Sequence, residues 1–144
     1  MARWWWRGVF SVEVPEGWQV RDFSEGVEFV PPDDSAAVHF SSHRREEPKA
    51  PEVGEASEWV RDFLLNNLAA EAGDHPPESP TPFGRACMIS FVQDGEDAPR
   101  YWEVGVHLWP ERAVFFTYNH DAFRPDLQES ARSIFRSAEP DASG

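Results

Sequence analysis

The spacing of hydrophobic residues changes three times along this 144-residue chain, and this constrains the fold more than any other feature. Residues 10–14 alternate hydrophobic with polar, the period-2 pattern of a strand with one buried face. The spacing becomes helical over 56–68, returns to strand-like runs over 85–120, and is helical again after Pro125. The chain therefore groups its strands on either side of a helix.

Turn residues divide the two strand groups. Pro15-Glu16-Gly17 and Pro31-Pro32-Asp33-Asp34 interrupt the first group, and Asp94-Gly95-Glu96-Asp97 interrupts the second. The predicted strands are 10–14, 18–23, 27–30, 36–42, 85–93, 101–109 and 112–120. Because the links are short, we expect the first three to form an antiparallel meander. The prediction is an α+β fold with an antiparallel sheet of six to seven strands, in the order ββββ-α-βββ-α, and two packing helices.

Each predicted helix has one apolar stripe. The first contributes Ala56, Trp59, Val60, Phe63, Leu64 and Leu68, and Gly73 is a natural stop beyond it. Four prolines within 75–82 predict an extended connector. The second helix begins at Pro125 and contributes Leu127, Ala131, Ile134 and Phe135. We expect one domain over 1–138, followed by a frayed polar tail over 139–144.

Composition narrows the classes of partner. Twenty-six acidic against 13 basic residues give a net charge of −13, which repels nucleic acid and anionic lipid. No stretch has the roughly 18 apolar residues of a membrane span. A single cysteine, Cys87, excludes an intramolecular disulfide. The expected compartment is the cytoplasm of a bacterium.

Two stretches carry a family resemblance. The segment FSVEVPEGW, residues 10–18, resembles the opening strand and turn of the fold shared by PsbP, the Ran-binding Mog protein and bacterial DcrB-like proteins. The ending from Tyr101 through Phe116 to Ile134-Phe135 also resembles this fold. The resemblance is nearest to DcrB-like proteins and to chaperones of type VI secretion effectors. It implies a non-enzymatic adaptor or secretion chaperone with no cofactor.

The expected partner is another protein or an apolar peptide, and a second copy of the chain is a further candidate. Seven tryptophans are more than a core of this size needs, so some should remain for binding. The predicted partner-binding residues are Trp4, Trp5, Trp6, Trp102, Trp109, Phe115 and Tyr118. The Trp4–Trp6 run, flanked by arginines, also fits a membrane interface, but the acidic body opposes that. An immunity protein that neutralises a basic toxin is the alternative function.

An enzyme is the third hypothesis. It requires a pocket that holds two of Glu103, His107, His120 and Asp121 with perturbed pKa values. A zinc site across strands would use the same histidines with Glu103, whereas His39 and His43 lie too far apart along one strand. The sequence predicts an inert core thiol for Cys87 and a solvated hairpin, rather than a calcium loop, at 94–97. The acidic face of the first helix is predicted to be solvated and could steer a basic partner; its residues are Glu52, Glu55, Glu58, Asp62 and Glu71.

Overall fold

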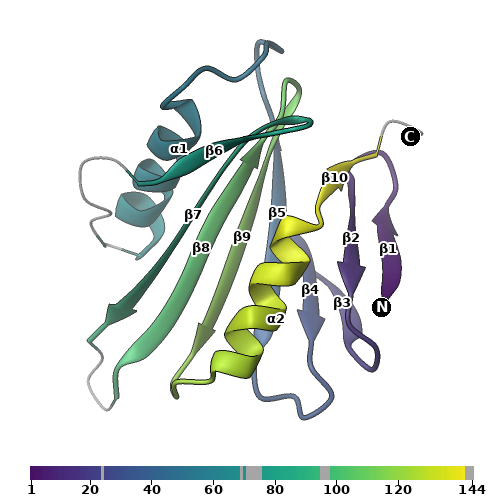
Figure 1. Ribbon diagram of the computed structural model, residues 1–144, viewed down its shortest axis with the longest axis vertical. Coiled ribbons are helices and arrows are strands. Elements are labelled where there is room, and N and C mark those ends of the chain that lie inside the picture. The colour runs from purple at the N-terminus through teal and green to yellow at the C-terminus, as the bar shows by residue number, and fades with distance from the viewer. Residues whose placement is uncertain (24, 69, 71–75, 95–97, 142–144) are drawn as a thin grey trace.

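The computed structural model describes residues 1–23, 25–68, 70, 76–94 and 98–141. It confirms the α+β class, with strands grouped on either side of a helix (Figure 1). The elements are β1 (Ala2–Trp6), β2 (Phe10–Val14), β3 (Gln19–Phe23), β4 (Gly26–Val30), β5 (Ala37–Arg44), α1 (Glu55–Phe63), the π-helical turn η1 (Leu64–Leu68), β6 (Glu78–Thr81), β7 (Gly84–Gln93), β8 (Arg100–Leu108), β9 (Arg112–His120), α2 (Pro125–Arg136) and β10 (Glu139–Pro140).

Seven strands form one antiparallel sheet in the order β3-β4-β5-β9-β8-β7-β6. The two strand groups meet where β5 pairs with β9, and Phe40 lies opposite Phe116. The extended 75–82 connector supplies β6 at the sheet edge, where Pro80 does not interrupt an interior ladder. The large sheet therefore joins segments that are far apart in the sequence.

The predicted meander is wrong for its first strand. β2 pairs with β1 and β10 in a separate three-stranded sheet, and it does not pair with β3. The reason is the position of its apolar face: Phe10 packs over the large sheet, with its ring centroid 5.2 Å from that of Phe40. The small sheet is thus a second layer, and only β3-β4-β5 form a meander.

The expectation of a frayed tail also needs correction. Glu139 and Pro140 pair with β2 as β10, and the Gly8 N–H donates to Asp141 Oδ2 at 2.9 Å. Asp141 is buried. These contacts fix the chain up to 141, and residues 142–144 lie outside the described part.

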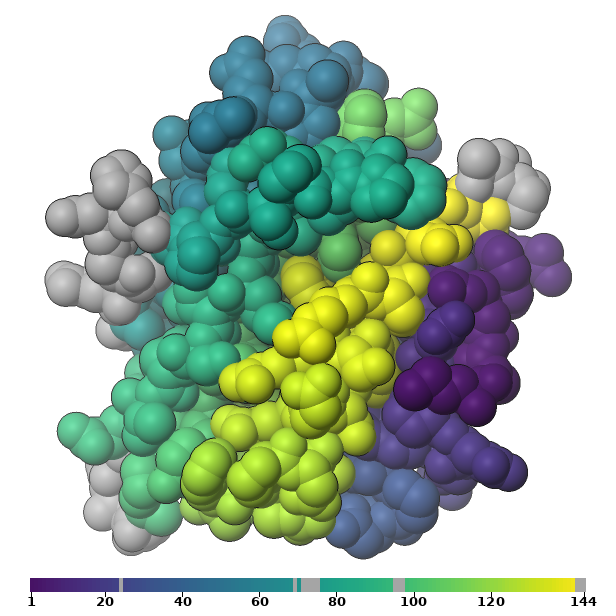
Figure 2. Space-filling view, viewed as in Figure 1, coloured from purple at the N-terminus to yellow at the C-terminus, as the bar shows by residue number. Residues whose placement is uncertain are grey.

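One hydrophobic core lies between the large sheet, the small sheet and α2. The apolar stripe of α2 in this core is the one predicted from the sequence, Leu127, Ala131, Ile134 and Phe135. The Phe135 ring packs on Phe116 at the centre of the sheet, with 5.0 Å between the ring centroids. Gly105 permits this close approach, because a Cβ there would lie 2.9 Å from the Phe135 ring. Figure 2 shows α2 (yellow) packed between the N-terminal strands (purple) and the β6–β7 segment (teal).

A second core lies on the opposite face of the large sheet. There α1 buries Ala56, Val60 and Leu64 against side chains of β7, β8 and β9. The predicted 56–68 helix is present, but its last turn is π-helical, and Gly73 is outside the described residues. α1 packs mainly on β7 and β8, and its aromatic residues reach Phe115 on β9. This face of the sheet is therefore only partly covered by a helix.

Candidate functional site

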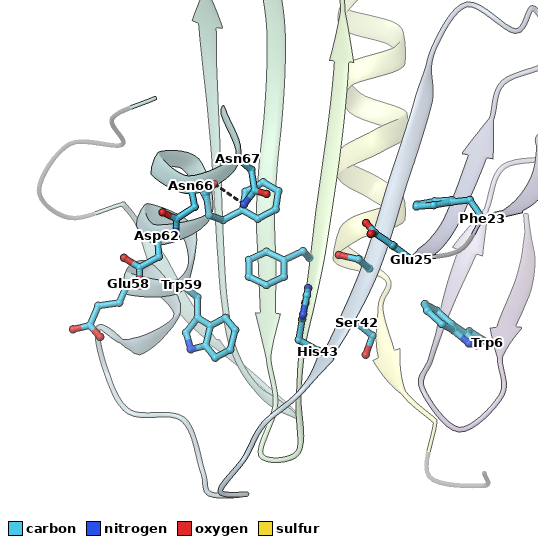
Figure 3. Close-up of a pocket in the computed structure, with 14 residues that line it drawn as sticks. Trp6, Phe23, Glu25, Ser42, His43, Glu58, Trp59, Asp62, Asn66 and Asn67 are labelled. Carbon is cyan, nitrogen blue, oxygen red and sulfur yellow. Dashed lines mark hydrogen bonds between the residues drawn. The ribbon is translucent and has the colours of Figure 1, made fainter. Parts of the chain in front are cut away.

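A groove of about 910 Å3 lies between α1 and the β3–β4 end of the large sheet. We call it the α1 groove (Figure 3). Five segments distant in sequence contribute to it: the end of β1, the β3–β4 turn, β5, α1 with η1, and β9. The lining residues are Trp6, Phe23, Glu25, Gly26, Ser41, Ser42, His43, Glu58, Trp59, Asp62, Phe63, Asn66, Asn67 and Phe115.

Helical spacing makes the α1 wall of the groove. Residues four apart lie on the same side of a helix, which places Glu58, Asp62 and Asn66 in one row and Trp59 and Phe63 in the next. Figure 3 shows the first row along the outer rim of the wall. The π-helical turn begins directly after Phe63 and carries Asn66, and such turns are frequent at functional sites.

Aromatic rings form the floor. The Phe63 ring stacks on the Phe115 ring with 4.9 Å between centroids. The centroid of the Trp59 ring lies 5.8 Å from that of Phe115. His43 on β5 meets the same ring edge-on at 5.3 Å. Phe115 is buried by these neighbours, but Trp59 and Phe63 are only half-buried and His43 is exposed. The floor therefore presents apolar surface to solvent.

The opposite wall is formed by the β3–β4 turn. Phe23 is 42% exposed and its ring contacts His39 at 5.6 Å. Gly26 lies between the walls. No larger residue fits at this position, because a Cβ there would lie 2.0 Å from the Phe40 carbonyl oxygen. Figure 3 shows Phe23 and Glu25 facing α1 across the groove.

The groove is acidic. Glu25, Glu58 and Asp62 are exposed, and none of their side chains forms a hydrogen bond or ion pair with another described residue. The lining contains no arginine or lysine among the residues that the structure describes. Negative potential is therefore left uncompensated along an aromatic floor.

The N-terminal end of the α1 wall is held by one buried carboxylate. Glu78 on β6 accepts the N–H groups of Gly54 at 2.5 Å and Ser57 at 2.9 Å, and the Arg85 guanidinium at 2.7 Å. Burial raises the pKa of Glu78, but these donors outweigh burial and hold the pKa below its ordinary value. A negative charge also suits the positive end of the helix dipole.

A second contact holds the same end of α1. The Arg45 guanidinium lies 2.5 Å from Glu55 Oε2 and also donates to the carbonyl oxygens of Lys49 and Trp109. The side chain of Arg45 is buried. Together with Glu78, this contact fixes one wall of the groove to the sheet.

The predicted aromatic face does not exist as one surface. Trp109 and Tyr118 are 2% and 0% exposed in the core beneath α2, so they are unavailable to a partner in this structure. Trp102 and Phe115 lie on the opposite face, in the core beneath α1. The cause is that β8 and β9 are buried on both faces, so successive aromatic residues enter different cores.

The three N-terminal tryptophans also divide between two faces. Trp4 and Trp6 pack against the core, with Trp4 5.2 Å from the Phe29 ring, and Trp5 points away and is 45% exposed. Of the seven predicted residues, Trp6 and Phe115 line the α1 groove. Trp102 is half-buried and stacks on Phe91 at 6.2 Å.

Of the four ionisable candidates, only His120 and Asp121 come together: His120 Nδ1 lies 3.1 Å from Asp121 Oδ1, and both line a pocket at the end of β9. Glu103 and His107 have other partners. Glu103 pairs with Arg132 at 2.6 Å, and His107 Nε2 lies 2.7 Å from the Phe135 carbonyl oxygen. His120 Nδ1 accepts the Ala122 N–H at 2.9 Å, which fixes the turn before α2. No group of three potential metal ligands is present in the described part of the chain.

Cys87 and the 94–97 hairpin give separate outcomes. Burial raises the pKa of the Cys87 thiol to about 11, consistent with the predicted inert core thiol. Residues 95–97 of the predicted solvated hairpin lie outside the described residues, as does Glu71 of the acidic helix face. Among the described residues, no helix is long and apolar enough to cross a bilayer.

Sequence reasoning missed Phe23, Glu25 and His43 as site residues. They lie on different strands, and no local motif links them. One signal was available: the i, i+4 spacing of Glu58 with Asp62 beside that of Trp59 with Phe63. This spacing places an acidic row beside an aromatic row on α1.

Comparisons with known proteins show the fold. No protein-family model matches the chain. A search of curated proteins also finds no match. A solved structure from Bacteroides thetaiotaomicron VPI-5482 is similar over 96% of this chain, with a TM-score of 0.62 and 14% sequence identity. LpqN, involved in cell envelope biogenesis of Mycobacterium tuberculosis, is similar over 91% of this chain and 82% of its own, with a TM-score of 0.52 and 14% identity.

The chain spans about half of the Bacteroides protein, 47% of its length. At 14% identity both likenesses concern the fold alone. The resemblance to PsbP and Mog stays a prediction.

Proposed function

We propose that this chain is a non-enzymatic protein-binding module that holds a segment of a partner protein in the α1 groove. The observation that carries the proposal is the combination of a groove of about 910 Å3 with half-buried aromatic side chains on its floor. Ligand pockets span roughly 300–1,000 Å3, so this one is large enough for several side chains of a partner.

The aromatic residues supply the binding free energy in this proposal. Trp59 and Phe63 have apolar surface that a partner would cover, and large aromatic residues are enriched among the residues that dominate interfaces. Full burial of such a side chain stabilises a complex by about 1.5–3 kcal/mol. The binding surface is thus smaller than the aromatic face expected from sequence and uses mostly different residues.

The placement of groups with shifted pKa values supports binding over catalysis. Catalytic sites commonly gather such groups in one cleft. Here Glu78, Cys87, His107 and Tyr118 have shifted pKa values, and none of them lines the α1 groove. Glu78 and His107 line a separate pocket beside β6, so this preference for binding over catalysis concerns the α1 groove alone.

The biological role that we propose is that of a bacterial adaptor or secretion-effector chaperone, as the sequence resemblance implies. The role of LpqN in envelope biogenesis belongs to that protein, and its likeness to this chain supports only a shared fold. An immunity protein would use the same acidic groove for a toxin. The identity of the protein that occupies the groove separates these two roles.

Photo-crosslinking tests the proposal. A photoreactive phenylalanine at Asn66 places the probe in the groove, and the same residue at Glu129 places it on the exposed side of α2 as a matched control. We expect a defined partner protein to crosslink in host cells from position 66 and not from position 129. The same product from both positions, or no product from position 66, would contradict the proposal.

A further inference from the structure

We infer that the segment held in the α1 groove is basic, with arginine side chains among aliphatic ones. This inference rests on the proposed function and specifies its partner chemistry. It follows from the acidic row on α1, the acidic residue on the opposite wall and the rings between them.

The two walls provide acceptors on both sides of the groove. Glu58 and Asp62 lie one helical turn apart along the outer rim of the α1 wall, and Glu25 lies on the opposite wall, at the β3–β4 turn (Figure 3). A guanidinium group suits this arrangement, because its planar donors pair with a carboxylate while its face stacks on an aromatic ring. The half-buried rings of Trp59 and Phe63 lie at the floor for such stacking.

The carboxylates of the groove lack the arginine partner that many other carboxylates of the chain have, and they share this with exposed residues such as Glu46, Glu47 and Glu111. The more buried Glu55, Glu78 and Glu103 each pair with an arginine of the chain. Even the exposed α2 carboxylates pair, Asp126 with Arg124 at 3.0 Å and Glu129 with Arg136 at 3.3 Å. Glu25, Glu58 and Asp62 pair with no arginine among the described residues.

Desolvation makes a cation necessary. A neutral apolar segment that filled the groove would remove water from these carboxylates without replacing its hydrogen bonds, and that costs free energy. An acidic segment would add like-charge repulsion to this cost. Arginine removes both penalties, and aliphatic neighbours cover the exposed rings.

Defined peptides test the inference. The probes are fluorescein-labelled (Arg-Leu)4, (Gly-Leu)4 and (Glu-Leu)4, measured by fluorescence anisotropy with the full chain. We expect (Arg-Leu)4 to bind, (Glu-Leu)4 not to bind, and binding to weaken as NaCl rises from about 50 to about 300 mM. If (Gly-Leu)4 binds as tightly as (Arg-Leu)4, or if (Arg-Leu)4 does not bind, the inference is wrong.

A matched pair of variants separates the groove from the general negative field of the chain. E58Q/D62N removes two charges from the groove, and D126N/E129Q removes two from α2. We expect the Kd for (Arg-Leu)4 to rise about ten-fold or more with the first double variant. With the second double variant it should rise less than about two-fold. Equal weakening would overturn the inference. Thermal unfolding of both variants controls for folding.

The proposed function can fail separately from this inference. Crosslinking from position 66 to a partner segment without basic residues would refute the basic segment and leave the binding module intact. Loss of the position-specific crosslink would refute the binding module itself.

Discussion

Arg132 places its Nη2 atom 2.6 Å from Oε1 of Glu103, so a carboxylate at the centre of the sheet is neutralised by a cation from α2. Glu103 is 0% exposed, and its second oxygen accepts the Ser90 hydroxyl. Arg132 also donates to that hydroxyl at 3.0 Å. The three side chains fix α2 to β7 and β8.

Removal of one partner from this buried pair should destabilise the fold strongly. We expect R132L to lower the free energy of unfolding by about 3 kcal/mol, because Glu103 is then buried without its cation. Urea denaturation measures the change. The double variant E103L/R132L should recover most of the loss, since an apolar pair leaves no buried charge. A double variant as unstable as R132L would show that packing, not charge, dominates.

His107 should make stability depend on pH. Burial lowers its pKa to about 4 from an ordinary value of 6.5, so the unfolded chain binds a proton in this range and the folded chain does not. Stability should therefore fall as the pH drops from about 6.5 towards 4, by about 2 kcal/mol between pH 6.5 and 5.

The variant H107Q isolates this contribution. Glutamine retains a donor for the Phe135 carbonyl oxygen but does not titrate. Denaturation at several pH values should show wild type losing stability relative to H107Q as the pH falls. Parallel profiles for the two proteins would contradict the assignment.

Glu78 should have the opposite kind of dependence. Its pKa is lowered in the folded state, so its contribution is present above the ordinary value of 4.5 and is lost as the pH falls through the folded value. At neutral pH E78Q should cost about 1–3 kcal/mol, because charge-assisted bonds to Gly54, Ser57 and Arg85 are weakened. The difference from wild type should shrink at about pH 3. A constant difference would exclude the carboxylate charge as its source.

The single thiol offers a direct measure of α1 opening. Cys87 is 1% exposed beneath α1, and burial raises its pKa to about 11. We expect a disulfide reagent at about pH 8 to label the native protein slowly and the urea-unfolded protein at once. E78Q should speed native labelling, because it loosens the anchor of α1, whereas E129Q on α2 should not. Equal rates for E78Q and wild type would contradict this role of Glu78.

Gly105 should not tolerate a side chain. The Cβ of G105A would lie 2.9 Å from the Phe135 ring and 3.1 Å from the Cys87 carbonyl oxygen, so the ring must move. We expect a loss of about 1–3 kcal/mol in thermal or urea unfolding. G105A/F135L should lose less than the sum of its single variants, because leucine leaves room for the methyl group. Strict additivity would contradict the contact.

Local patterns predicted the elements well. The alternation of 10–14 and the Leu127, Ala131, Ile134, Phe135 stripe both describe buried faces that the structure shows. The alternation could not indicate which sheet β2 joins, because a period-2 pattern defines a buried face and not a pairing partner. The pairing of β2 with β1 and β10 depends on contacts between distant parts of the chain.

The candidate site was harder to predict for a related reason. Strands buried on both faces lack a regular alternation of polar and apolar residues that would mark their orientation, so Trp109 and Phe115 could not be assigned to opposite cores. The acidic row of α1 was visible in the sequence. The wall that faces it was not, because Glu25 is brought opposite Asp62 only by the order of strands in the sheet.

The two walls of the α1 groove pack into different hydrophobic cores. Val60 and Leu64 hold α1 in one core, whereas Val27 and Phe29 hold β4 in the other, across the sheet. The groove thus has two walls that stand on the same sheet but are anchored separately. The distance between the two walls is therefore set by the strands that join them, β5 and β9, and not by either core alone.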